Sequence, residues 1–252
     1  MKPDARQQQI LARLTAIQKE WRVEELAENM RVSAITIRRD LDSLARQGAI
    51  IRTFGGCLID NRRRLAAYHE RVAKNFKAKQ AIGQAAAREI KKGDVILIND
   101  GSTTFHLAGC LDKCGPLTVY TNSVVMIPEI SRFPNVRLYV LGGEYQRDFF
   151  YLGGSLMERV LESVRVDIAF VGTDSISPEG VCYCQDEDAA RIVRLMMRQA
   201  KRSILLADHG KVGARAPVKV AGLKEFALWI TSKGLKPGER NRFKRLTCLK
   251  EV

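Results

Sequence analysis

The stretch "VSAITIRRDL", residues 32–41, decides the fold of the first third of this chain. Ile37 and Leu41 recur at helical spacing, and Ser33 stands where the N-cap of a helix is expected. The two adjacent arginines fall away from that apolar stripe. The stretch therefore predicts an amphipathic helix that buries one face, continued by Leu44, and presents arginine on the other.

Two further helices are predicted ahead of this one, the second of them short, and each has a single apolar stripe. The stripes are Ile10, Leu11, Leu14 and Ile17 in the first, and Val23, Leu26, Ala27 and Met30 in the second. A third helix held on two others, with arginines in its first turns, has the geometry of a helix-turn-helix recognition helix. The planar guanidinium suits that position because it can grip guanine or a phosphate with two hydrogen bonds.

The sequence "GAIIRTFGG", residues 48–56, predicts a β-wing after this helix. Gly48 can end the helix in a left-handed conformation, Ala49 to Arg52 can form a strand, and Gly55-Gly56 gives a tight turn before "CLID" returns. Arg52 is then expected near a flanking phosphate or the minor groove. Asp40 is assigned to the scaffold, as an ion pair or a cap, because a carboxylate facing phosphates would be repelled.

Composition and charge agree with a nucleic-acid-binding segment on a more neutral remainder. The 252 residues are 46% hydrophobic and carry a formal charge of +14, which suits two domains and an anionic partner. Residues 1–80 hold 17 Lys and Arg against 9 Asp and Glu, whereas residues 81–252 hold 25 against 19. A protein docking module is the alternative interpretation of the basic N-terminal segment.

The sequence predicts neither a membrane-spanning helix nor a signal peptide for export. No apolar run is long enough to cross a bilayer, and "MKPDARQQQI" has no apolar signal core. The six cysteines are interpreted as reduced thiols rather than a disulfide framework. We therefore expect a cytoplasmic protein.

The remainder of the chain alternates strand-like and helix-like segments. The strand-like runs are "DVILIN", "LTVYT", "VRLYVL", "VDIAFVG", "RSILLAD" and "FALWIT". The helix-like runs are "TTFHLAGCL", "SVVMIPEI", which is interrupted near Pro128, and "DEDAARIVRLMMRQA". This order predicts an α/β domain with a parallel sheet, whose ligands gather at the carboxyl ends of the strands.

Polar residues fall at the ends of these predicted strands and are the candidate effector-binding set. The set is Asp100, Gly101, Ser102, Thr103, Thr104, Asn122, Gly142, Gly143, Asp174, Asp208 and Lys211. The run "DGSTT" at 100–104 opens a helix, so its hydroxyls, its backbone N–H groups and the helix dipole can hold a phosphate. An ordinary turn capped by Ser102 or Thr103 is the alternative.

Residues 61–75 predict a basic linker that passes into a helix continuing through "AIGQAAAREI". Arg62, Arg63 and Arg64, closest to the wing, are candidates for contact with DNA phosphates. The basic residues from Lys74 to Lys79 are interpreted as a solvated face.

The cysteines do not predict a metal site, and no cofactor is predicted. His106, Cys110 and Cys114 are spaced by four residues, but a structural zinc site needs four ligands and no fourth stands nearby. Cys182 and Cys184 alternate as in a strand and face the same side. For Tyr145 and Phe149-Phe150, both a subunit interface and internal packing remain open.

The run "VSAITIRRDLDSLARQGAIIRTFGG" resembles the N-terminal signature of the DeoR family of bacterial transcription regulators. Further similar motifs are "DGSTT", "TNS" at 121–123, "LGGEY" at 141–145 and "DHGKVG" at 208–213. The resemblance implies a winged helix-turn-helix over residues 1–60, joined to a sugar-phosphate-sensing domain over residues 76–252 that is similar in fold to ribose-5-phosphate isomerase. Many members have a glutamate where this chain has Ala189, so the chain departs from the usual ligand contacts there.

Two functions follow from these observations. The first is a DNA-binding transcriptional regulator, a repressor of a sugar or polyol catabolic operon that a phosphorylated sugar or polyol releases from its operator. The second is a sugar-phosphate isomerase-like enzyme with a basic head, for which Asp100, Asp174, Asp208 and Lys211 could supply the base. We favour the regulator and predict no enzyme, since the departure at Ala189 also weakens the second interpretation.

The regulator has three predicted partners: double-stranded operator DNA, the effector and further copies of the chain. A dimer or tetramer is expected because one recognition helix covers few base pairs. The candidate DNA-binding residues are Ser33, Thr36, Arg38, Arg39, Arg46, Arg52, Arg62, Arg63 and Arg64.

Overall fold

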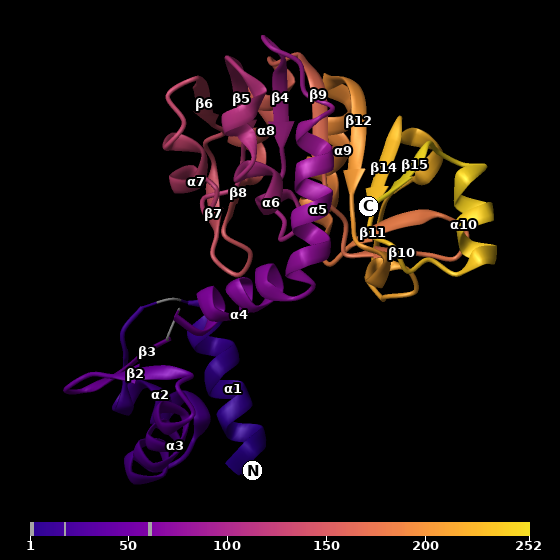
Figure 1. The fold of residues 1–252 in the computed structure, drawn as a ribbon. Coiled ribbons are helices and arrows are strands. Elements are labelled where there is room, and N and C mark those ends of the chain that lie inside the picture. Colours follow the sequence, from indigo (N-terminus) through magenta and orange to yellow (C-terminus); the bar gives the residue numbers. More distant parts are fainter. Residues whose placement is uncertain (1–2, 18, 60–61) are drawn as a thin grey trace. The chain divides into compact units, whose positions relative to one another are not determined.

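The structure, a computed structural model, describes residues 3–17, 19–59 and 62–252. The chain divides into two compact units, Met1–Glu70 and Arg71–Val252, which we call the head and the body (Figure 1). None of the helices in the described ranges is long and apolar enough to cross a membrane.

The described part of the head contains three helices and a small antiparallel sheet, followed by the start of a fourth helix. The helices are α1 (Pro3–Ala16), α2 (Val23–Met30), α3 (Ala34–Arg46) and α4 (Arg62–Ala73), which runs past the boundary into the body. The strands are β1 (Trp21–Arg22), β2 (Ile50–Arg52) and β3 (Gly56–Ile59), in the order β1-β3-β2. The predicted winged helix-turn-helix is thus formed, with β1 as an unpredicted third strand.

One buried cluster holds the head together. It contains the predicted stripe residues Ile10, Leu14, Val23, Leu26, Ala27, Ile37, Leu41 and Leu44. The prediction for Ile17 is wrong, because α1 ends at Ala16 and Ile17 is 56% exposed. Trp21 is buried in this cluster instead, and its indole N–H donates to the Ile17 carbonyl at 2.9 Å.

Local chemistry sets the ends of α3 and the turn of the wing. The Ser33 hydroxyl accepts a hydrogen bond from the Thr36 N–H at 3.2 Å, which confirms the predicted N-cap. Gly48 follows the helix with a φ of +65°, as predicted. A Cβ added to Gly56 would lie 1.9 Å from the Trp21 carbonyl oxygen, so the close passage of β1 requires glycine there.

Asp40 belongs to the scaffold, as predicted, and its partner is Arg6. The Arg6 Nε donates to Asp40 Oδ2 at 2.5 Å and its Nη2 donates to Oδ1 at 3.2 Å. Both residues are buried, with exposed fractions of 9% and 3%. The bond to the carboxylate raises the pKa of Arg6 above its ordinary value. The pair joins α1 to α3 inside the head.

Seven parallel strands form the main sheet of the body, which confirms the predicted sheet. They are β4 (Val95–Ile98), β5 (Leu117–Thr121), β6 (Val136–Val140), β9 (Val166–Val171), β12 (Ala200–Leu206), β14 (Leu228–Thr231) and β15 (Leu249–Glu251). Their order is β15-β14-β12-β9-β4-β5-β6. The chain leaves β4 toward β5 and β6 and later returns to its other side with β9. The topological switch point therefore lies between β4 and β9, where open α/β sheets bind ligands.

Helices cover both faces of this sheet (Figure 1). One face carries α5 (Phe76–Ala87), α6 (Thr104–Ala108) and α7 (Ile127–Ser131), and the other carries α8 (Gly154–Glu162), α9 (Glu187–Gln199) and α10 (Pro237–Lys244). Successive strand residues point to opposite faces, so Ile96 and Ile98 join the first core and Leu97 joins the second.

Two small antiparallel sheets extend the body and were not predicted. One has the order β10-β11-β13 and the other pairs β7 with β8. Their bounds are β7 (Glu144–Gln146), β8 (Tyr151–Gly153), β10 (Ser175–Ile176), β11 (Val181–Cys184) and β13 (Val218–Gly222). Short 3₁₀ turns are η1 (Leu111–Cys114), η2 (His209–Lys211) and η3 (Leu223–Glu225).

Two local predictions for the body are wrong. The third, a linker that passes into a helix, differs from the structure because the linker is itself helical. Pro128 stands in the first turn of α7, where proline is tolerated, so it does not interrupt that helix. The run "TTFHLAGCL" is helical only to Ala108. The predicted linker is largely the helix α4, which is separated from α5 near Asn75, a residue with a φ of +58°.

Replacing Asp40 by alanine is expected to destabilise the head by about 3–5 kcal/mol, because Arg6 would be left buried without its charged partner. Urea denaturation of the full chain, followed at the head by hydrogen exchange of the α3 amides because Trp229 of the body also fluoresces, measures the loss. Asp42→Ala in the same helix is the matched control, since Asp42 is exposed and its replacement should change stability by about 0.5 kcal/mol or less. Equal midpoints for the two variants would contradict a structural role for the buried pair.

Candidate nucleic-acid interface and effector site

Helix α3 presents basic side chains on the face opposite its buried stripe. Arg38, Arg39 and Arg46 are exposed there, while Ile37 and Leu41 on the inner face are fully buried. Ser33 and Thr36 start the same face, and their hydroxyl oxygens lie 2.9 Å apart. Arg38 Nη2 lies 3.7 Å from Glu24 Oε1, an exposed ion pair that contributes little to stability and leaves the arginine free to rearrange.

Arg52 connects the wing to this helix. Its Nε lies 3.3 Å from Asp42 Oδ1, and the side chain is 32% exposed. Asp42 stands between Arg39 and Arg46 on the outer face, so the ion pair neutralises a carboxylate that lies between two arginines of α3. Arg52 thereby neutralises a charge that would repel phosphates.

The two most exposed large apolar side chains of the described head, Ile35 and Phe54, were not singled out from the sequence. Ile35 is 64% exposed at the start of α3, and Phe54 is fully exposed between β2 and β3. The exposure of Ile35 could have been predicted from the sequence. Residue 35 does not fall on the buried helical stripe formed by Ile37, Leu41 and Leu44.

The linker arginines stay a prediction. Helix α4 begins at Arg62, but the side chains of Arg62, Arg63 and Arg64 lie outside the described part of the structure.

The candidate effector residues lie at the carboxyl ends of five neighbouring strands. Residues 100–104 follow β4, Asn122 follows β5, Gly142 and Gly143 follow β6, Asp174 follows β9, and Asp208 and Lys211 follow β12. Since all five strands run parallel, these ends share one edge of the sheet.

Asp100 and Asn122 are in direct contact across the ends of β4 and β5. The Asp100 N–H donates to Asn122 Oδ1 at 3.1 Å, and Asn122 Nδ2 donates to Asp100 Oδ1 at 3.3 Å. Burial, together with the nearby carboxylates of Asp174 and Asp186, raises the pKa of Asp100 to about 7, although the bond from Asn122 opposes the shift. Near neutral pH this carboxyl can therefore donate or accept hydrogen bonds with sugar hydroxyls.

Thr104 supports the loop from within. Its hydroxyl donates to the carbonyls of Asn99 at 2.9 Å and Gly101 at 3.0 Å, and the residue is fully buried. The Thr103 side chain does not cap α6, which speaks against the ordinary capped turn. Helix α6 has only five residues, so its dipole is weak and an anion here needs another source of positive charge.

Lys79 supplies that charge, and its interpretation as part of a solvated face is wrong. The residue is 4% exposed, and its Nζ donates to the Arg71 carbonyl and to Ser102 Oγ, the latter at 3.0 Å. Burial lowers the pKa of Lys79 to about 8, while the Asp208 carboxylate acts in the opposite direction. The signal was present in the sequence, because Lys79 shares one helical face with Ile82, Gly83 and Ala86.

Asp208 lies close to this lysine and is itself held in place. Its Oδ1 accepts hydrogen bonds from Asn75 Nδ2 at 3.2 Å and from the Gly210 N–H at 3.1 Å. Lys211, in the turn η2, is half-buried and is a second positive neighbour of Lys79. The ends of β4 and β12 thus contribute to one cluster of mixed charge around Lys79.

Asn99 ties the two strands at the switch point together and was not predicted. Its amide oxygen accepts the Gly172 N–H at 2.9 Å, which joins the end of β4 to the end of β9. Beyond β9, Asp174 Oδ2 accepts the Gln185 N–H at 3.1 Å. Asp174 is therefore positioned on the same side as Asp100, whose pKa it raises.

The ligand contacts of Gly142 and Gly143 stay a prediction, and Gly143 also has close packing contacts. A Cβ on Gly142 would meet open space, whereas one on Gly143 would lie 2.3 Å from the Gly153 carbonyl oxygen and 2.9 Å from the Met157 Cβ. The contacts of Gly143 are thus with the β8 segment and with α8.

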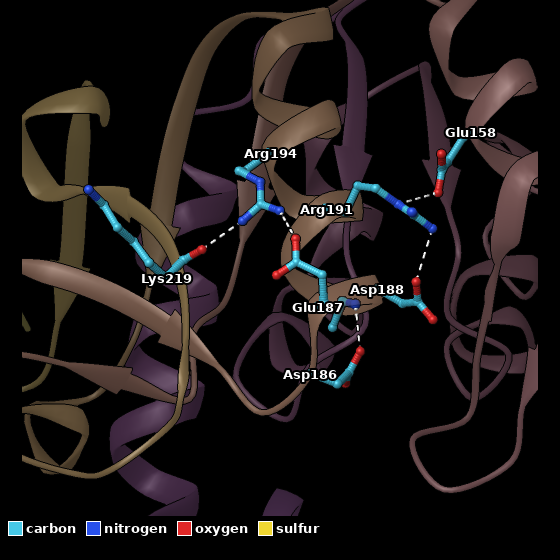
Figure 2. Close-up of polar contacts among 8 residues, drawn as sticks. Glu158, Asp186, Glu187, Asp188, Arg191, Arg194 and Lys219 are labelled. Atoms are coloured by element: carbon cyan, nitrogen blue, oxygen red, sulfur yellow. Dashed lines mark hydrogen bonds and ion pairs between the residues drawn. The ribbon is translucent and has the colours of Figure 1, made fainter.

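A network of charged side chains anchors the start of α9 beside this edge (Figure 2). Asp186 caps the helix by accepting the Ala189 N–H at 2.8 Å. Arg191 pairs with Glu158 of α8 at 2.7 Å and with Asp188 at 2.9 Å (Figure 2). Arg194 binds Glu187 and donates to the Lys219 carbonyl of β13 at 2.6 Å. These bonds fix Asp186 close enough to Asp100 to raise its pKa.

Ala189 is the third residue of α9, the position from which a glutamate can return a hydrogen bond to the N-cap backbone. In this chain the Asp186 side chain makes the cap by itself. The departure from the family pattern therefore changes the helix terminus that borders the site.

The cysteines pack or bond to the backbone. His106 Nε2 lies 3.2 Å from the Val72 carbonyl, Cys110 Sγ donates to the His106 carbonyl at 3.2 Å, and Cys114 Sγ to the Ala87 carbonyl at 3.6 Å. Cys182 and Cys184 share the buried side of β11, as predicted. Phe150 is buried, with a φ of +60°, and Tyr145 is 41% exposed on β7.

Comparison with known proteins assigns both units. Residues 6–63 match the DeoR-like helix-turn-helix domain, and residues 74–233 match the DeoR C terminal sensor domain. The chain belongs to the DeoR family. The prediction of a DNA-binding transcription regulator, rather than an enzyme, is confirmed by this family and by the relatives below.

Two curated relatives cover most of this DeoR family member. The HTH-type transcriptional repressor GlcR of Bacillus subtilis is 35% identical over 211 residues, or 83% of this chain and 81% of that protein. The HTH-type transcriptional regulator GlpR of Haloferax volcanii is 33% identical over 210 residues, or 83% of this chain and 82% of that protein. Among solved structures, ribose 5-phosphate isomerase A of Methanocaldococcus jannaschii is similar over 55% of each chain, with 17% identity and a TM-score of 0.41.

The Arg52–Asp42 pair gives a test of how the wing contributes to DNA binding. Arg52→Ala should weaken binding by about 1–3 kcal/mol, because Asp42 is then unpaired among the arginines of α3. Adding Asp42→Asn should restore most of the loss, as measured by fluorescence anisotropy with a duplex selected from a random pool. A double variant as weak as the single one would show that Arg52 acts through a direct phosphate contact instead.

Proposed function

We propose that this DeoR family regulator is a repressor of a sugar or polyol catabolic operon, and that a phosphorylated sugar or polyol releases it from its operator. The observation that carries the proposal is the buried ammonium of Lys79 beside Ser102, next to the Asp100–Asn122 pair at the switch point of the sheet. The name of the relative GlcR, a transcriptional repressor, supports the direction of regulation.

The head would bind double-stranded operator DNA in the cytoplasm, as a dimer or tetramer. Arg38, Arg39 and Arg46 on the exposed face of α3 are suited to base edges and phosphates, and Ser33 and Thr36 begin that face. We assign Arg62, Arg63 and Arg64 to phosphate contacts that set the orientation of the protein on the duplex. Two-fold pairing of heads would match a palindromic operator.

The effector site combines a cation with groups that bind hydroxyls. Lys79 and the Ser102 hydroxyl would receive the phosphate, with Lys211 as a second positive charge nearby. The carboxyls of Asp100, Asp174 and Asp208, with the Asn122 amide, would bind the sugar hydroxyls. Gly101 and Thr103 would contribute backbone N–H groups, and Thr104 would keep the loop in shape. A phosphorylated sugar or polyol offers both kinds of partner.

Lys79 also offers a physical route from ligand to helix α4. Its Nζ donates both to Ser102 and to the carbonyl of Arg71, in the last turn of α4. A phosphate at Ser102 attracts the ammonium more strongly than a neutral carbonyl does, so the bond to Arg71 is the one that would weaken. Ligand binding would then favour an arrangement in which the end of α4 is less restrained, which shifts the population of states.

Removing the charge of Lys79 should abolish the response to the effector and, because the bond to the Arg71 carbonyl is lost as well, should also weaken DNA binding in the absence of ligand. A thermal-shift screen of sugar phosphates on the full chain should find a ligand that adds about 2.7 kcal/mol of stability at a hundredfold excess over its Kd. The same ligand should release the DNA in a gel shift. Lys79→Met should lose both effects, whereas Lys77→Met, on the exposed side of the same helix, should keep them.

Three outcomes would count against the proposed function. A broad panel of phosphorylated sugars and polyols could leave the melting curve unchanged. A ligand found in the screen could leave the DNA complex intact. Equal responses from the Lys79 and Lys77 variants would place the phosphate elsewhere.

Effector affinity should also fall as the pH rises past the pKa of Lys79, which burial lowers to about 8. A bound phosphate favours the ammonium form, so its contribution is complete below that pH and is lost above it. The ligand phosphate loses its second proton near pH ~6, well below this range. Titration calorimetry across pH 8 measures the decline.

Lys79→Arg is the matched variant, because a guanidinium stays charged across the same range. If it binds the effector, its affinity should not decline with pH. Asp208, Lys211, Lys74 and Arg71 surround the same ammonium in both variants. A wild-type affinity that stays level through pH 8 would remove Lys79 from the phosphate contact.

A further inference from the structure

Ile35 occupies the outer face of α3, among the arginines. It is the second residue of the helix and is 64% exposed. Arg39 lies one turn further along the same side, and Arg46 continues that side. Ile35 does not belong to the buried cluster of the described head or to the side chains packed against it.

Neither helix stability nor solubility explains an isoleucine at this position. A β-branched side chain is a weaker helix former than alanine or arginine, and an exposed one leaves apolar area in water. The neighbours on this face are charged, so the apolar side chain of Ile35 stands among groups that are suited to a polar partner. The side chain gains free energy only if a partner covers it.

The position of Ile35 in the recognition helix points to that partner. Residues in the first turns of such a helix reach the base edges in the major groove. The apolar group that a base presents there is the 5-methyl group of thymine. We infer that Ile35 contacts a thymine methyl group and so sets part of the operator sequence. The inference rests on the proposed function only in taking α3 as the recognition helix.

Removing either side of this contact should have the same effect. A duplex selected from a random pool with the wild-type protein should contain a thymine whose replacement by deoxyuridine weakens binding about fourfold, the factor for burial of one methyl group. Ile35→Ala should bind the thymine duplex more weakly than wild type. At that position it should bind the deoxyuridine and thymine duplexes equally, so that the two changes are not additive.

Two further variants separate the possible failures. Ile17→Ala removes an isoleucine that is 56% exposed outside α3, and it should keep the wild-type response to deoxyuridine. Arg39→Ala should weaken binding to both duplexes. If Ile35→Ala shows the same sensitivity as wild type at every thymine, Ile35 touches no methyl group and the inference is wrong. If Arg39→Ala also binds as tightly as wild type, the error lies in the assignment of α3.

Discussion

The parallel direction of the seven strands is the constraint on which the sensing half of this protein depends. Parallel pairing brings every carboxyl end to one edge, so polar residues spread over more than a hundred positions of sequence meet there. The order of the strands also separates the loops at this edge, because β5 lies on one side of β4 and β9 lies on the other. The loops after β4 and β9 therefore diverge, and Asn99 bonds to Gly172 where they part. Asp100 and Asp174 take their places from that geometry.

Burial is what changes the chemistry of the groups at this edge. Lys79 and Asp100 both lose hydration, yet the effect on charge is opposite, since burial lowers the pKa of an ammonium and raises that of a carboxyl. The two shifts bring both groups toward neutral pH. An Asp with a pKa of about 7 is also what proton transfer would need, so the distinction between sensor and isomerase comes from the family and not from this residue.

The sequence was informative where one pattern ran over several turns or strands. The stripe of α3 and six of the seven strands of the main sheet were predictable from apolar runs, whereas the three-residue edge strand β15 was not. The strand β1 and the two antiparallel sheets were not, since strands of two to five residues are selected by their tertiary partners. The place of "DGSTT" and Asn122 at the edge of the sheet could be predicted, because each directly follows a predicted strand. Lys79 was missed although its helical face was readable, because the neighbouring Lys74 and Lys77 gave the segment the composition of a solvated basic face.

Helix α4 is the element that belongs to both units by sequence, and its last turn is in contact with residues of the proposed effector site. The carbonyls of Arg71 and Val72 contact Lys79 and His106, so two side chains of the body restrain the end of this helix. A ligand that takes Lys79 away from Arg71 has a different affinity for the restrained and the released states. That difference sets the limit of regulation, because a hundredfold preference shifts the equilibrium by about 2.7 kcal/mol and no more. A single shared lysine is thus enough to couple an anion to α4, provided that the two states of this helix differ in free energy by a similar amount.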